Sequence, residues 1–164
     1  MTDNKTGAEE ETVTYTYDAA GNRLTETKGG NTTSYSYNNL NQLTEATETG
    51  TGSSAIRTYS YDRNGNQTAE VTKEGTVETE RRTFTYDEAN RLTGLSVKEG
   101  ETVTLTQSNR YNDEGQRIEK VETKLVSGLE GTIKETEKTE YYYQNGAVLY
   151  SEDANGNMST MNLM

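Results

Sequence analysis

Two short segments carry oxygen-bearing side chains at alternating positions, as a calcium-binding loop does. They are Asp62-Arg63-Asn64-Gly65-Asn66 and Asp153-Ala154-Asn155-Gly156-Asn157. An EF-hand loop needs glycine at its sixth position and a bidentate glutamate at its twelfth. Glycine is fourth in both segments, so hairpin turns with Asn and Gly in left-handed conformations explain them better. We therefore expect neither a metal nor any other cofactor.

Tyrosine rings offer a second possible chemistry, because they can stack on the faces of sugar rings while nearby Asn, Asp and Thr bond the hydroxyls. The chain has 12 tyrosines and one phenylalanine. The alternative is structural, since tyrosines at alternate positions of a strand pack across neighbouring strands and bond backbone or turn groups through their hydroxyls. We expect a packed ladder and keep glycan binding as the alternative. The expected ladder consists of Tyr15, Tyr17, Tyr35, Tyr37, Tyr59, Tyr61, Phe84, Tyr86, Tyr111, Tyr141 and Tyr143.

Catalysis is restricted by composition. The chain has no Cys and no His, which excludes a histidine-activated nucleophile, a disulfide framework and a thiolate metal site. A glycosidase-like carboxylate pair remains formally open, but nothing distinguishes two of the 27 acidic residues. We predict that the protein is not an enzyme. The net charge of −11 opposes binding to nucleic acid or anionic membranes, and no apolar run is long enough to span a bilayer.

The elements that position these residues recur along the chain. The tyrosines that end the aromatic pairs or their looser copies are separated by 20, 24, 25, 25 and 32 residues, which indicates a repeat architecture. Each runs into a short turn and then an apolar residue. The predicted turn positions are Asp18, Gly21, Asn38, Asn41, Asp62, Gly65, Asp87, Asn90, Asn112, Gly115, Gly146, Asp153 and Gly156.

The segments before and after each turn alternate with the period of two that is typical of strands. In residues 12–17, valine and tyrosine fall on one face and threonine on the other. Glycine-containing connections such as Gly29-Gly30 and Glu99-Gly100 then link one hairpin to the next. The sequence therefore predicts an all-β fold of repeated hairpins stacked into a twisted antiparallel strip. We expect a flexible acidic lead over residues 1–11, six to seven hairpins over 12–157 and a tail over 158–164.

Edge protection is also expected to come from charge. The chain has no proline, so terminal strands would rely on charged residues, which are plentiful in residues 134–140.

The pattern Tyr-x-Tyr-Asp-x-x-Gly-Asn-Arg-Leu-Thr resembles the YD repeat, also called the Rhs repeat. The resemblance covers residues 12–157 and is strongest in the first, third and fourth copies. The second copy has Asn38 and Asn41 in the Asp and Gly places, and the later ones have Asn112 and Gln144 in the Asp place. The family includes bacterial polymorphic toxins, wall-associated proteins, insecticidal toxin complex subunits and teneurins. The resemblance implies a strip of hairpins that winds into a hollow shell.

The resemblance also implies a role. We expect a non-catalytic structural segment of a larger secreted or surface bacterial protein, whose shell encloses or presents a C-terminal toxin effector. Its partners would be the rest of that shell and the effector domain. The acidic start is unlike a signal peptide, so none is expected in this fragment. A cell-wall glycan module and a homo-oligomer assembled through open sheet edges are the alternatives.

Overall fold

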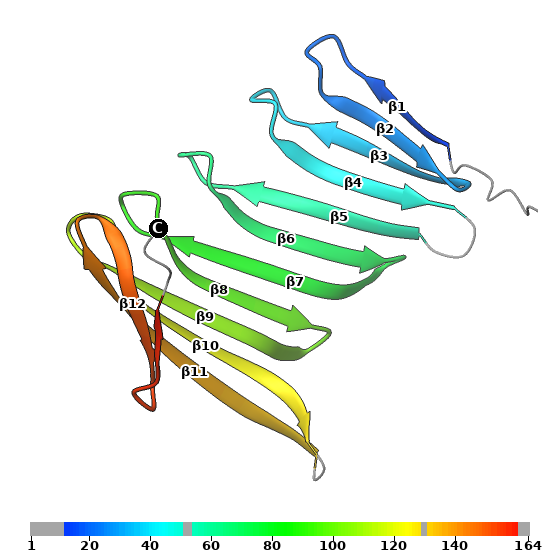
Figure 1. Ribbon diagram of the computed structural model, residues 1–164. Helices are drawn as coiled ribbons and strands as arrows, with labels where there is room; N and C mark the ends of the chain where they lie inside the picture. The colour runs from blue at the N-terminus through cyan, green and yellow to red at the C-terminus, as the bar shows by residue number, and fades with distance from the viewer. Residues whose placement is uncertain (1–11, 51–53, 129–130, 161–164) are drawn as a thin grey trace, which may run out of the picture. The chain divides into compact units, whose positions relative to one another are not determined.

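The computed structural model describes residues 12–50, 54–128 and 131–160, and these contain thirteen strands and no helix (Figure 1). The all-β prediction is confirmed. The lead predicted for residues 1–11 lies outside the described residues. Within the described ranges, no helix has the length and apolar character needed to cross a membrane.

Every strand is antiparallel to the next in sequence, and the strand order is sequential from β1 to β13 in one open sheet. The fold is thus a series of hairpins, as predicted. The strands are β1 Val13–Tyr17, β2 Arg23–Lys28, β3 Asn31–Tyr37, β4 Leu43–Thr49, β5 Ser54–Tyr61, β6 Gln67–Glu74, β7 Val77–Tyr86, β8 Leu92–Glu99, β9 Thr102–Tyr111, β10 Arg117–Gly128, β11 Gly131–Gln144, β12 Ala147–Asp153 and β13 Met158–Thr160.

The chain divides into two compact units. The first comprises Met1–Thr58 and Lys73–Val77, and the second comprises Tyr59–Thr72 and Glu78–Met164. The first unit holds β1 to β4 and most of β5, and the second holds most of β6, most of β7 and all of β8 to β13.

In the first unit, the register separates an aromatic face from a hydroxyl face. Tyr35 lies opposite Ala46, which is only 5% exposed. On the other face, Thr16 lies opposite Thr25 and their hydroxyls are 2.6 Å apart. Such threonine pairs stabilise neighbouring strands without a hydrophobic core.

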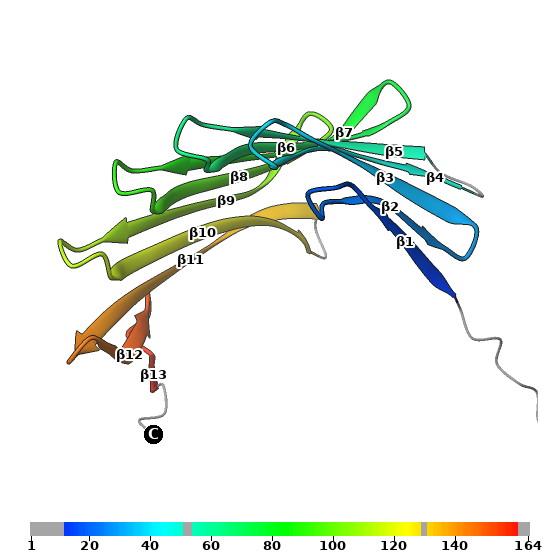
Figure 2. The ribbon, with the colours of Figure 1, turned by 90° about the horizontal axis from the view of Figure 1, so that it is seen from above.

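The second unit has the same two faces. Phe84 lies opposite Leu95, while Thr83 lies opposite Ser96. The hydroxyl row continues through Thr106, Thr123 and Thr136, which are paired in turn from β9 to β11. Figure 2 shows β8 to β11 as a single layer of strands.

The apolar core is very small. Among the described residues, Ala46 and Val71 are the buried hydrophobic residues. The remaining apolar side chains are half-buried or exposed, so hydrogen bonds between neighbouring hairpins must supply much of the structural specificity.

The last hairpins depart from the regular pattern. The turn between β11 and β12 consists of two residues, Asn145 and Gly146, with backbone φ angles of 53° and 80°. It is short because Gln144 extends strand β11 instead of opening a five-residue turn. The turn that begins at Asp153 follows β12, so it lies at the opposite strand end from the earlier five-residue turns. Residues 158–160, predicted as the start of a tail, form β13.

Candidate functional site

Six five-residue turns share one backbone geometry. They span residues 18–22, 38–42, 62–66, 87–91, 112–116 and 153–157. In the first, the Asp18 N–H donates to the Asn22 carbonyl at 2.9 Å, and the Gly21 N–H donates to the Asp18 carbonyl at 3.1 Å. The fourth position always has a left-handed φ, which favours glycine or asparagine. Those residues are Gly21, Asn41, Gly65, Asn90, Gly115 and Gly156.

The side chain at the first turn position caps the loop. Asp18 Oδ1 accepts from the Ala20 N–H at 2.9 Å and from the Asn22 N–H at 2.8 Å. The same two bonds recur in every one of the six turns. This use of one side-chain oxygen explains why only Asp or Asn occupies the position.

The first and fifth turn residues are chemically matched. Where the first is Asp, the fifth is a donor, as in Asp62, whose Oδ2 accepts from Asn66 Nδ2 at 2.9 Å. Where the first is Asn, its Nδ2 must donate, and the fifth residue is Gln, as in Asn112 Nδ2 to Gln116 Oε1 at 2.8 Å. Sequence reasoning missed this pairing, although the paired choices can be read in the repeat. The other matched pairs are Asp18–Asn22, Asn38–Gln42, Asp87–Arg91 and Asp153–Asn157.

The hydrogen bonds to the turn aspartates lower their pKa values. For Asp18, Asp62 and Asp153 the main cause is the hydrogen bond from the asparagine side chain at the fifth position. For Asp87 the lowering of the pKa comes first from the Arg91 backbone N–H. These carboxylates are therefore ionised in the folded protein, where they act as acceptors within their own turns.

Adjacent turns also bond one another within each unit. In the first unit, Asn22 Nδ2 donates to Asn41 Oδ1 at 3.0 Å. In the second, Asn66 Nδ2 donates to Asn90 Oδ1 at 2.7 Å, and Arg91 Nη1 donates to the Asn112 carbonyl at 3.1 Å. Asn41 and Asn90, the two asparagines at the fourth turn position, therefore supply an acceptor that glycine would lack.

The second tyrosine of a repeat reaches back to the preceding hairpin. Tyr37 donates its hydroxyl to the Arg23 carbonyl at 2.8 Å, and Arg23 is the first residue of β2. Equivalent bonds join Tyr86 to the Gln67 carbonyl, Tyr111 to the Leu92 carbonyl and Tyr143 to the Arg117 carbonyl, at 2.9, 2.8 and 2.8 Å. We call these four bonds the tyrosine ladder. Each of the four ties a hairpin to its predecessor at a fixed register.

Burial supports this structural role. Burial raises the pKa of Tyr61, and burial together with the Asp62 charge raises the pKa of Tyr86.

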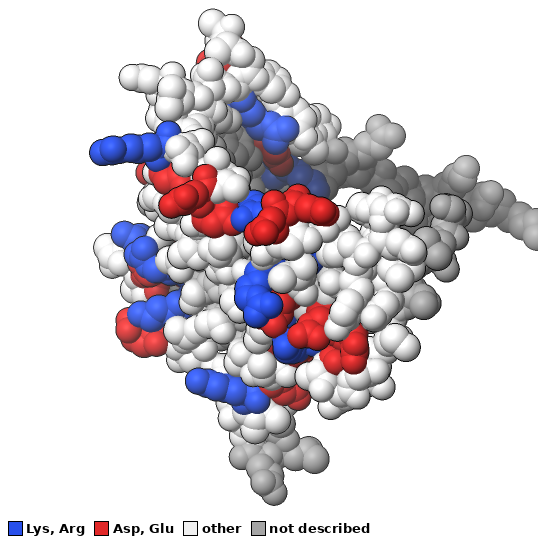
Figure 3. All heavy atoms as spheres, turned by 90° about the vertical axis from the view of Figure 1, so that its left-hand side faces the viewer, with Lys and Arg blue, Asp and Glu red and all other residues white. Residues whose placement is uncertain are grey.

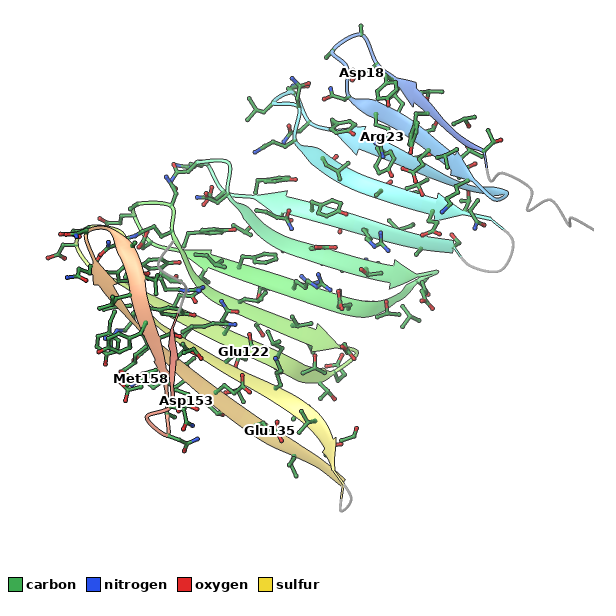
Figure 4. All side chains as sticks on the ribbon, in the orientation of Figure 1. Asp18, Arg23, Glu122, Glu135, Asp153 and Met158 are labelled. Atoms are coloured by element: carbon green, nitrogen blue, oxygen red, sulfur yellow. The ribbon has the colours of Figure 1, made fainter. Side chains whose placement is uncertain are left out.

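Arginines pack on the first tyrosines. The Arg117 guanidinium lies 4.8 Å from the centre of the Tyr141 ring, and its Nη2 donates to the Tyr141 hydroxyl at 3.1 Å. Arg23 lies 4.5 Å from the Tyr15 ring centre, and a hydrogen bond with the Tyr35 side chain is the main cause of its raised pKa. Figure 4 shows Asp18 in the turn after β1 and Arg23 at the start of β2.

Two of the predicted ladder tyrosines are exposed. Tyr15 is 44% exposed and Tyr17 is 56% exposed, because among the described strands β1 has a neighbour on one side, β2. The other predicted positions are half-buried: Tyr35, Tyr37, Tyr59, Tyr61, Phe84, Tyr86, Tyr111, Tyr141 and Tyr143. Sequence reasoning also missed Tyr150, which stacks on Tyr142 with ring centres 4.5 Å apart. The sequence signal for Tyr150 is its position three residues before Asp153, the same spacing that separates Tyr15 from Asp18.

Several charged side chains form ion pairs with one another. Glu122 contacts both Lys120 and Lys124, and the hydrogen bonds from Lys124 and then Lys120 lower its pKa. On the face shown in Figure 3, acidic and basic side chains lie side by side. In the described part of the chain, no group of three or more acidic residues is placed to hold a metal ion.

No protein-family model matches this chain, and no curated protein matches it. The role of the turn bonds and of the tyrosine ladder is therefore inferred from their own chemistry.

The matched pairs predict a reversible defect. Changing Asp62 to Asn places two amide donors opposite each other at Asn66, and we expect the thermal midpoint to fall by about 2–5 °C. Adding Asn66→Gln recreates the pair seen at Asn112 and Gln116 and should restore most of the loss. Thermal unfolding followed by circular dichroism measures both variants. A double variant no more stable than Asp62→Asn would contradict the matching rule.

The same pair makes the stability depend on pH. A carboxylate whose folded pKa is lowered stabilises the fold above its unfolded pKa of about 3.9, and this contribution is lost as the pH falls through the folded pKa. We therefore expect the midpoint to drop below about pH 4. The drop should be shallower in the Asp62→Asn/Asn66→Gln variant, which has one titrating turn fewer.

The tyrosine ladder predicts that its hydroxyls contribute to stability. Tyr37→Phe removes the donor to the Arg23 carbonyl and should lower the free energy of unfolding by about 0.5–1.5 kcal/mol. Tyr17→Phe is the matched control, because the Tyr17 hydroxyl has no hydrogen-bond partner among the described residues. Urea denaturation of both variants tests this, and equal losses would show that the hydroxyl bond adds nothing.

Proposed function

We propose that this chain is a non-catalytic structural segment, part of the β-hairpin shell of a larger secreted or surface protein of the Rhs or YD-repeat type. In such a protein the shell encloses or presents a C-terminal toxin effector. The partners are the remainder of the repeat shell and that effector.

The tyrosine ladder is the observation that carries the proposal. A surface that binds a substrate must keep donors and acceptors free for it, but here four tyrosine hydroxyls bond the backbone of the preceding hairpin. The turn carboxylates are likewise occupied by their own loops. These polar groups are thus used to shape the turns and to fix one hairpin on the next, which is the requirement of an extended wall.

The repeat-to-repeat bonding also supports the idea of a longer array. In a repeat protein each unit contacts its neighbours, so stability grows as units are added. With Ala46 and Val71 as the buried apolar residues of the described chain, the hairpins gain from neighbours more than from a core.

Fractionation of the source cells tests the proposal. An antibody raised against this chain should detect a polypeptide much larger than 18.2 kDa in the secreted or surface-exposed fraction, with the effector domain in the same assembly. Intact cells treated with an external protease should lose the surface signal. A product of 18.2 kDa confined to the cell contents would refute the proposal.

A glycan-binding role is the second candidate, and the exposed tyrosines of β1 favour it. Tyr15 lies opposite Glu26 on the aromatic face of the first unit. Glu26 also lines an open polar depression together with Lys28, Gly29, Asn31, Thr33 and Glu48. An exposed ring beside polar groups is an arrangement that can stack on a sugar and bond its hydroxyls.

Titration with soluble cell-wall polysaccharide separates the two functions. The structural role predicts no saturable change in tyrosine fluorescence. Saturable binding by the chain that Tyr15→Ala abolishes and Tyr142→Ala preserves would favour the glycan function, since Tyr142 is also exposed but belongs to β11.

A further inference from the structure

Tyr17 occupies a ladder position but lacks the ladder bond. It is the second tyrosine of the first repeat, equivalent to Tyr37 and Tyr86, whose hydroxyls bond the preceding hairpin. Among the described residues, no acceptor lies against the Tyr17 hydroxyl, and the side chain is 56% exposed. By equivalence with Tyr37 and Tyr86, the acceptor for this donor would come from a preceding strand.

Among the described strands, the one that carries Tyr17 is an edge strand without a charged side chain of its own. β1 is the first strand of the sheet order, and β2 is its partner among the described strands. Edge strands present unpaired backbone N–H and C=O groups and are normally blocked by charge, proline or short length. β1 consists of Val, Thr and Tyr alone, and the charged residues expected to protect an edge lie on β11, which is paired on both sides.

The opposite end of the array differs in three respects. β13 has only three residues, Glu152 stands where the second tyrosine of a repeat would be, and the Asp153 turn is at the reversed end of its hairpin. In the tyrosine ladder the later hairpin supplies the hydroxyl, so a hairpin added against β13 would bring its own tyrosine, but it would meet a strand of only three residues. The repeat geometry is continued at β1 and interrupted at β13.

We infer that the β1 edge is a docking site for one further hairpin of the same repeat type, supplied by another polypeptide segment. The inference rests on the proposed function. The docking strand is one that directly follows a five-residue Asp or Asn turn, runs antiparallel to β1, and offers its first carbonyl to the Tyr17 hydroxyl. An arginine at that first position would pack on Tyr15 as Arg117 packs on Tyr141.

A peptide of residues 102–127 is a suitable probe. It contains the β9–β10 hairpin, and its Arg117 carbonyl accepts the Tyr143 hydroxyl in the structure. Titrated into the full chain, it should bind with a stoichiometry of one and slow the hydrogen exchange of the β1 amides, followed by NMR. Tyr17→Phe should weaken binding about three- to tenfold, and Tyr150→Phe should leave it unchanged.

A tethered version keeps the test decisive, because an isolated hairpin is marginally stable in water. Residues 102–127 are joined through a short glycine linker in front of residue 12, in place of residues 1–11. The added hairpin should protect the β1 amides and raise the thermal midpoint, and Tyr17→Phe should remove part of the gain.

Three results would overturn the inference. The first is unchanged hydrogen exchange of the β1 amides in the tethered protein, and the second is a Tyr17→Phe variant with the same peptide affinity and the same gain in thermal midpoint as the unchanged protein. The third is self-association of the chain alone through β1. The last result would make a second copy the partner. If Tyr37→Phe is destabilising but the hairpin does not dock, this inference fails and the structural function stands. If Tyr37→Phe also has no effect, the observation behind the proposed function fails as well.

Discussion

A tyrosine hydroxyl that reaches across to the backbone of the preceding hairpin is the interaction on which the rest of the fold depends. The bond is made to the first residue of a strand, so its position fixes where the preceding turn must end. A single layer of strands has little interior, and the described residues bury only Ala46 and Val71 as apolar side chains. Register must therefore be set by directional bonds, because a hydrophobic face alone would tolerate a shift of two residues.

The turns follow from the same constraint. A tyrosine can reach the preceding strand only if that strand starts at a constant place, and a loop of constant length and shape ensures this. The capping oxygen at the first position, the left-handed residue at the fourth and the matched side chain at the fifth make the loop rigid. A left-handed backbone conformation costs more free energy for Asn41 and Asn90 than it would for glycine. The hydrogen bond that each asparagine accepts from the neighbouring turn offsets this cost.

Much of this fold could be predicted from the sequence because strand alternation and turn residues are local signals. The two faces of residues 12–17 and the turn positions such as Gly65 and Asn90 need no tertiary information. The hydroxyl acceptors could not be predicted, since the Arg23 carbonyl is a backbone atom without a residue-type signature. The reversed hairpin at Asp153 was also missed, because its motif is the same whichever strand precedes it. Exposure of Tyr15 and Tyr17 depends on what neighbours β1, which no local pattern specifies.

Exchange of the tyrosine hydroxyl protons, observed by NMR at low temperature, tests the central claim most directly. The account predicts slowly exchanging hydroxyl protons for Tyr37, Tyr86, Tyr111 and Tyr143, each with a contact to the strand that accepts its bond. Tyr17 should exchange with solvent too fast to be observed. If the four ladder hydroxyls exchange as fast as that of Tyr17, the hairpins are not held by these bonds and the account is wrong.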